Sequence, residues 1–113
     1  MRLNQTQYLG PKDPLERAVI EFDFTADLGP TETISAPFTV LVTLIVNGSP
    51  AIDPSPGDIL QGVNEVDDTG KVVLVAVQGG IDSLDYAIKC VPTCSNPVKA
   101  PALTCVLPVR EGA

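Results

Sequence analysis

The stretch Arg17-Ala18-Val19-Ile20-Glu21-Phe22-Asp23-Phe24-Thr25 decides the fold class of this chain. If it forms a β-strand, successive side chains point to opposite faces, which separates its even-numbered from its odd-numbered residues. The even-numbered side is a strip of apolar and aromatic carbon, whereas the odd-numbered side carries both acids. This alternation is typical of a strand with one face on a core and the other in water. We therefore expect Ile20, Phe22 and Phe24 to be core residues.

The length and composition of the chain fit a single all-β domain. A chain of 113 residues can bury about two-thirds of the surface that it exposes when unfolded. Aromatic residues make up 4% of the chain and tryptophan is absent, so we expect a core of valine, isoleucine, leucine and alanine. Its 11 prolines and 9 glycines fall mostly between apolar runs, as turn residues do in a β-sandwich.

Further apolar runs of strand length accompany the first one. The longest covers residues 38–46 and is strongly β-prone, and the proline at position 37 indicates a kink or an edge position. All such runs together predict about seven strands with turn signals between them, the pattern of a single immunoglobulin-like β-sandwich. The runs lie at residues 16–25, 32–35, 38–46, 59–60 with a separate run at 62–66, 71–78, 84–91 and 102–109. We assign the sandwich to residues 15–113.

Residues 1–14 precede the sandwich and are expected to form an extended N-terminal arm. The segment ends in Gly10-Pro11-Lys12-Asp13-Pro14, where two prolines favour a non-helical path. It has two interpretations, a frayed terminus or an arm that lies along a neighbouring subunit. In the second interpretation, Tyr8, Leu9 and Pro11 are the residues that contact the partner.

The charge of the chain restricts the partners that we expect. Fourteen acidic and seven basic residues give a formal net charge of -7. This balance disfavours nucleic acid, because phosphate binding needs clustered lysine and arginine. The acidity either keeps the protein soluble or complements a basic surface on a partner protein.

No membrane partner is expected either. The polar residues 1–13 lack the apolar region of a signal peptide. The run 38–46 contains two threonines and is too short to span a bilayer. We therefore expect the protein to be made in the cytoplasm and to stay there at first, with mostly reduced cysteines.

The three cysteines leave several outcomes open. Cys90, Cys94 and Cys105 have no histidine to join them, and a structural zinc site normally takes four cysteine or histidine ligands. We therefore expect no metal. Free buried thiols are the commoner outcome. The alternatives are a disulfide between Cys90 and Cys105, if these lie on paired final strands, or a small loop closed by Cys90 and Cys94.

The acidic residues do not form a recognisable catalytic or calcium-binding motif. Glu65, Asp67 and Asp68 surround a turn, but their spacing differs from that of an EF-hand loop, so a solvated turn is expected. Asp82 and Asp85, beside a double glycine, have the same interpretation. Because the chain has no histidine, the usual general base near neutral pH is absent. We expect neither enzymatic activity nor a cofactor.

Several short motifs, spread over about residues 12–110, resemble one family of proteins. The motifs are Lys12-Asp13-Pro14-Leu15-Glu16, Phe22-Asp23-Phe24-Thr25, Leu28, Glu32-Thr33-Ile34, Val75-x-Val77-x-Gly79-Gly80, Asp85-Tyr86-x-Ile88-x-Cys90 and Leu107-Pro108-Val109-Arg110. In these residues the chain resembles the small immunoglobulin-like structural proteins encoded in the morphogenesis clusters of tailed bacteriophages.

The resemblance implies a virion component that acts through protein–protein contacts. Its expected role is a capsid decoration or head-fibre protein, and its expected partners are other virion proteins and copies of itself. A tail-associated accessory protein is one alternative. Others are a module that binds carbohydrate on the host surface and a soluble regulator of a host complex. In a structural role, the edges of the sheets would extend pairing to neighbouring chains.

Overall fold

The computed structural model describes residues 1–45 and 52–113. The end of the predicted strand 38–46 and the predicted turn after it lie outside the described residues. Eight strands and two short 3-10 helices form the described part of the chain. They are β1 (Arg2–Leu3), β2 (Gln7–Tyr8), β3 (Ala18–Asp23), η1 (Thr25–Asp27), β4 (Ile34–Ile45), η2 (Pro56–Ile59), β5 (Leu60–Val66), β6 (Val72–Val77), β7 (Asp85–Cys94) and β8 (Leu103–Pro108).

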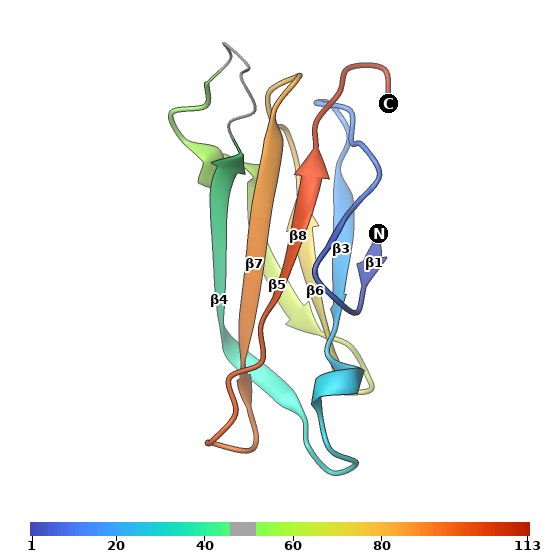
Figure 1. Cartoon of the computed structure of the whole chain (residues 1–113), viewed down its shortest axis with the longest axis vertical. Coiled ribbons are helices and arrows are strands. Elements are labelled where there is room, and N and C mark those ends of the chain that lie inside the picture. The colour runs from blue at the N-terminus through green and yellow to red at the C-terminus, as the bar shows by residue number, and fades with distance from the viewer. Residues whose placement is uncertain (46–51) are drawn as a thin grey trace.

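The strands form two four-stranded sheets that pack face to face. One sheet has the order β1-β3-β6-β5 and the other the order β2-β8-β7-β4. Figure 1 shows β4, β7 and β8 in the front layer, with β5, β6, β3 and β1 behind them. The predicted all-β sandwich is therefore confirmed. With β1 included, the first sheet has the strand order A-B-E-D of a constant-type immunoglobulin sheet. In the second sheet, β8-β7-β4 has the order G-F-C, and β2 is an additional strand. The immunoglobulin-like class itself stays a prediction.

The alternating stretch at residues 17–25 supplies the centre of the core. Ile20, Phe22 and Phe24 are fully buried, as their alternation predicted. Each apolar side chain of this size contributes about 1.5–3 kcal/mol when it is fully buried. The facing layer supplies Ile88 and Leu107, which are also fully buried. No helix in the described residues is long and apolar enough to cross a membrane.

Tyr86 on β7 joins the core to a surface loop. Its side chain is buried, and its hydroxyl donates a hydrogen bond to Asp53 Oδ2 at 2.7 Å. The same hydroxyl accepts one from the Ile81 N–H at 3.0 Å. A tyrosine that bonds back to the main chain a few residues upstream is the arrangement known as a tyrosine corner in immunoglobulin-like domains. Burial, together with the Asp53 bond, raises the pKa of Tyr86 to about 12.

Two strands expected at 32–35 and 38–46 are one strand in the structure. β4 runs through Pro37, and its pairing with β7 shifts register between Ser35 and Thr39. β4 is the last strand of its sheet, so the edge position indicated by the proline is confirmed.

The N-terminal segment is extended, but it lies along the sandwich instead of projecting from it. β1 pairs in parallel with β3 in one sheet, and β2 pairs in parallel with β8 in the other. Between them the chain crosses from one layer to the other, and Leu3 is buried in the core. The segment expected to be an arm, residues 1–14, therefore contributes one edge strand to each sheet. Pairing there satisfies main-chain groups that would otherwise face water.

Candidate interaction surface

The structure separates the three side chains that were predicted to contact a partner. Tyr8 is 68% exposed and pairs with Val106 of β8 on the outer face of its sheet. Leu9 belongs to the core, and its N–H donates to the Val106 carbonyl at 2.9 Å. Pro11 is exposed. Tyr8 and Pro11 are therefore open to a partner, whereas the side chain of Leu9 anchors the segment to its own domain.

Lys12 holds the segment in place, a role that no sequence pattern predicted. Its side chain is fully buried, although lysine is rarely buried without a partner. The ammonium group donates to the carbonyls of Asp13 at 2.7 Å, Glu16 at 2.8 Å and Gly79 at 2.5 Å. These three bonds use all the donors of an ammonium group. Burial nevertheless lowers the pKa of Lys12.

The main chain at Lys12 completes the attachment. Its N–H donates to the Pro108 carbonyl, and its own carbonyl accepts from the Arg110 N–H, both at 2.9 Å. The residue thus bridges the N-terminal segment to the end of β8 and to the turn after β6. The burial of Lys12 is not evident from the neighbouring sequence, because one of its three acceptors, the Gly79 carbonyl, lies 67 residues further along the chain.

The outer face of the β2-β8-β7-β4 sheet carries few charges. One row across it joins Thr43, Ala87, Val106 and Tyr8. The next row places Lys89 between a leucine on β4 and a threonine on β8. The one other charged residue on these strands is the aspartate that begins β7, in the last row. An arginine that follows β8 has its Nη2 2.7 Å from the carboxylate of this aspartate. We refer to this side of the sheet, from Tyr8 to β4, as the outer sheet face.

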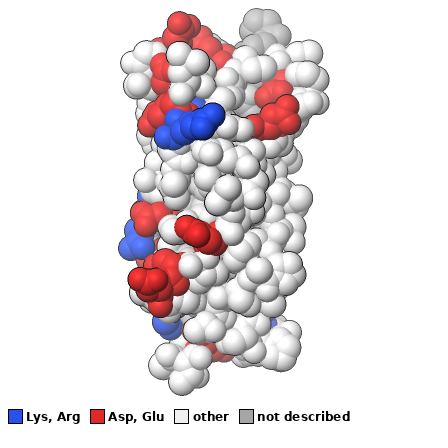
Figure 2. All heavy atoms as spheres, turned by 180° about the vertical axis from the view of Figure 1, so that it is seen from behind, with Lys and Arg blue, Asp and Glu red and all other residues white. Residues whose placement is uncertain are grey.

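The opposite layer differs in charge. Figure 2 shows acidic and basic side chains gathered over the β1 and β3 side of that layer and around the upper end of the molecule. Arg2 contributes there, with Nη atoms 3.7 Å from Glu21 and 3.9 Å from Asp23. Exposed pairs of this kind contribute less than about 1 kcal/mol each. The two faces of the sandwich therefore present different chemistry to a partner.

The four edge strands are protected to different degrees against pairing with another chain. β1 and β2 have only two residues each. β5 carries Glu65, and its pairing with β6 is interrupted between Leu60 and Asn64, where Gly62 has a φ of +82°. Short strands, charges and bulges are the usual protections of sheet edges. β4 has 12 residues, and none of them is charged.

The second half of β4 is regular and exposes apolar carbon. Residues 39–45 pair with β7 without interruption. We refer to them as the β4 edge. On the inner side, Val40, Val42 and Leu44 pack against the core but remain only partly buried. On the outer side, Leu41 is 55% exposed.

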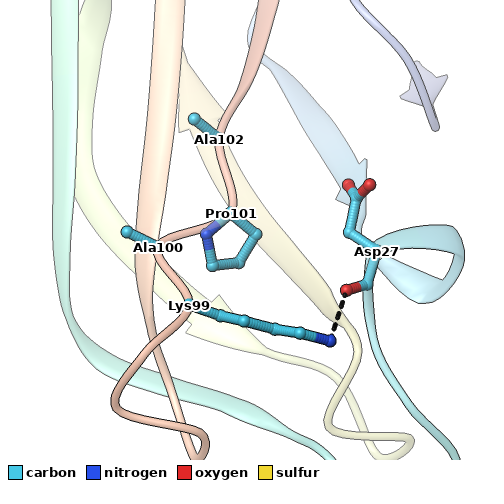
Figure 3. Close-up of a pocket in the computed structure, with 5 residues that line it drawn as sticks. All are labelled: Asp27, Lys99, Ala100, Pro101 and Ala102. Atoms are coloured by element: carbon cyan, nitrogen blue, oxygen red, sulfur yellow. Dashed lines mark hydrogen bonds between the residues drawn. The ribbon is translucent and has the colours of Figure 1, made fainter.

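A shallow hollow lies at the lower end of the molecule, as drawn in Figure 3. It has a volume of about 240 Å³ and is lined by Asp27, Lys99, Ala100, Pro101 and Ala102. The Lys99 ammonium donates to the Asp27 main-chain carbonyl at 3.4 Å and to Glu32 Oε1 at 2.6 Å. The one cation in this hollow is therefore already engaged by groups of the chain itself.

Glu32 organises the turns around this hollow. Besides Lys99, its carboxylate accepts from the Gly29 N–H at 2.6 Å and from Asn96 Nδ2 at 2.9 Å. The Gly29 bond contributes most to lowering the pKa of Glu32 to about 2, followed by Lys99 and Asn96. These bonds connect the loop before β4 to the loop between β7 and β8, so the role of Glu32 is structural.

The cysteines lie in the core as free thiols. Cys90 and Cys105 are on the paired strands β7 and β8, as one alternative required, and both are fully buried. Cys105 pairs with Ile88 instead of Cys90, so the two cysteines are offset by two residues. Cys94 is buried near the end of β7 and is also free. Burial raises the pKa of Cys90 and Cys105 to about 12, which keeps both as unreactive thiols.

The acidic residues near the turns bind main-chain groups and neighbouring side chains. Asp67 Oδ1 accepts from the N–H and the hydroxyl of Thr69, at 3.1 and 2.6 Å. Gly70 closes this turn with a φ of +70°. Asp82 accepts from the Glu111 N–H at 2.8 Å. Within residues 1–45 and 52–113, no three histidine, cysteine or acidic residues are grouped so as to hold a metal ion.

Over the described residues, the fold and this surface define a β-sandwich domain with one outer face that carries few charges and one long edge strand, β4, without a charged residue. Comparisons with models of protein families, with curated proteins and with solved structures found no match for the chain.

Proposed function

We propose that this protein is a structural component of a tailed-phage virion, acting through protein–protein contacts as a capsid decoration or head-fibre protein. The observation that carries the proposal is the outer sheet face, which is nearly free of charge in a chain of net charge -7. It exposes Tyr8 at one edge and Leu41 at the other, with Lys89 between them. Exposed apolar patches framed by polar residues mark sites of protein interaction.

The geometry of the outer sheet face suits a lattice of repeated contacts. A sheet face is rigid, so little conformational entropy is lost when it docks on another surface. Tyrosine is among the residues that contribute most to such contacts. Many copies of a weak contact, repeated over a symmetric particle, give high avidity.

The family resemblance supports the virion assignment, and its motifs have clear structural roles. Lys12 ties the N-terminal segment to the sandwich. Gly80, with a φ of +93°, lies where a Cβ would approach a valine methyl to 2.8 Å. Phe22 and Phe24 fill the core. The resemblance thus rests on residues that determine this fold, and the outer sheet face is where the function is expected.

The alternatives keep the same surface but change the partner. A tail-associated accessory protein would bind tail proteins through the outer sheet face. A module that binds host carbohydrate would use Tyr8, the exposed aromatic side chain of β2, as a platform for a sugar ring. In that case Tyr8→Ala abolishes binding to host glycans.

The test is mass spectrometry of particles purified from the phage or prophage that carries the gene. We expect the protein in the particles at a copy number that follows the capsid symmetry. A copy number matching the tail tip supports the tail alternative, and absence from particles refutes the virion assignment.

Variants then locate the contact. Tyr8→Lys adds a charge to the outer sheet face and should lower particle occupancy. Val19→Lys adds the same charge on the opposite layer, at a strand position that is 46% exposed, and should leave occupancy unchanged. Equal occupancy for both variants would show that the outer sheet face is not the contact.

A further inference from the structure

We propose that the protein pairs with a second copy of itself through the β4 edge. The two strands run antiparallel about a two-fold axis, so that two four-stranded sheets become one continuous sheet. This inference concerns the free protein and does not depend on the proposed virion role.

The first argument is the main chain of the β4 edge. In a strand, every second residue directs its N–H and C=O groups away from the neighbouring strand, and at an edge these groups face outward. Residues 39–45 keep a regular register with β7, so their outward groups are evenly spaced along a straight edge. The occupant that matches such a row is another β-strand. Among the described strands, β4 alone is a long edge without charge or bulge in this half.

The second argument is charge. Two copies of a chain with a net charge of -7 repel each other unless their contact avoids the acidic residues. β4 carries no charged residue over its whole length, from Ile34 to Ile45. By contrast, β5, the longer edge strand of the other layer, carries Glu65, which would be brought close to its own copy in a similar pairing. Pairing of two copies along the β4 edge therefore brings no acidic residues of that strand together, so charge repulsion is smallest there.

The third argument is the side-chain pattern, which is self-complementary. Antiparallel pairing about Val42 places Val40 opposite Leu44 and Leu41 opposite Thr43 of the second copy. Because each pair has the same parity, inner side chains meet inner ones and outer side chains meet outer ones. The inner row is only partly buried in the single chain, so pairing removes more of its apolar surface from water. Apolar and threonine pairs of this kind stabilise neighbouring strands.

The geometry also limits the assembly to a pair. The contact is isologous, since the same strand serves both partners, and it closes on itself. The remaining edges are two-residue strands or carry a register interruption, so the sheet does not grow further. A contact along one strand is smaller than a standard interface, so we expect a reversible dimer with a dissociation constant in the micromolar to millimolar range.

The test is sedimentation of the purified full-length protein over a range of concentrations. The wild type should shift from the chain mass of 11.8 kDa towards twice that mass as concentration rises. Leu41→Lys places a lysine of each copy close to the other and should raise the dissociation constant about ten-fold or more. Val19→Lys carries the same added charge on the opposite layer and should dimerise like the wild type. Circular dichroism checks that each variant is folded.

Hydrogen exchange of the wild type gives a second readout that needs no variant. Alternate amides within residues 39–45 should become more protected as the concentration rises. A protein that stays monomeric up to millimolar concentration overturns the proposal. So does a dimer that Leu41→Lys leaves intact, or one that protects other strands and not β4. Tyr8→Lys, on the far edge of the sheet, should dimerise normally, so the dimer and the virion role are tested separately.

Discussion

Replacing Lys12 by methionine tests whether a buried ammonium group holds the N-terminal segment on the sandwich. Methionine keeps the apolar stem but removes the donor from three carbonyl acceptors, those of Asp13, Glu16 and Gly79. Hydrogen bonds to a charged group contribute about 1.5–3 kcal/mol each, whereas burying an ammonium group costs several kcal/mol. The two contributions largely offset each other, and the unsatisfied carbonyls remain as the net loss. We expect Lys12→Met to lower the free energy of unfolding by about 2–3 kcal/mol.

The assay is urea unfolding followed by circular dichroism, with thermal unfolding as a second measurement. A loss of this size corresponds to a decrease in Tm of about 10 °C for a domain of this length. Lys89→Met removes an exposed lysine from β7 as the matched control, and its effect should stay within about 0.5 kcal/mol. Hydrogen exchange should also accelerate at the Leu9 amide, which bonds to β8. If Lys12→Met unfolds like Lys89→Met, the three hydrogen bonds do not hold the segment.

Further predictions concern a carboxylate, a glycine and a tyrosine. The pKa of Glu32 is lowered to about 2 in the folded protein, so its contribution to stability is present above pH 4.5 and is lost as the pH falls towards 2; the difference in Tm between wild type and Glu32→Gln should shrink over that range, and a constant difference would contradict this. Gly80→Ala should cost about 2 kcal/mol in urea unfolding, because φ is +93° and a Cβ would meet a valine methyl at 2.8 Å. Gly10→Ala, with nothing within 4 Å of a Cβ, should be close to neutral, and equal effects would refute the steric argument. Tyr86→Phe should cost about 1–2 kcal/mol because the Asp53 carboxylate loses its donor, and an unchanged urea midpoint would show that this bond is not stabilising.

The alternation of buried and exposed side chains along β3 was predictable from the local sequence. Ile20, Phe22 and Phe24 are buried as their alternation requires. Side-chain alternation depends only on the strand itself, so one stretch of sequence is enough to predict it.

The placement of the N-terminal segment was not predictable in the same way. A polar stretch with two prolines indicates an extended path, but it does not indicate what the path lies against. Leu9 is buried because it meets β8, and Lys12 because it meets the carbonyl of Gly79. Both β8 and Gly79 are distant in the sequence. The partner of Lys12 is a main-chain carbonyl, which every residue type has, so the sequence does not reveal it.

The candidate surface was predictable in part. Tyr8 was expected to be accessible and is 68% exposed. The lack of charge in residues 38–46 is visible in the sequence, and Pro37 indicated a kink or an edge. Which strand stands next to β4 depends on the order of the sheet, and that order follows from the packing of the two layers.

The crossing of the N-terminal segment between the layers has a consequence for how the protein is made. β2 is translated before β3 to β7, but its partner β8 is translated after them. The ribosome therefore synthesises all the intervening strands before Tyr8 and Lys12 can reach their final positions. Contacts between such distant residues close late and slow the folding reaction. A nascent chain stalled before residue 103 should consequently expose its first residues to proteases, even if β3 and β6 have already paired.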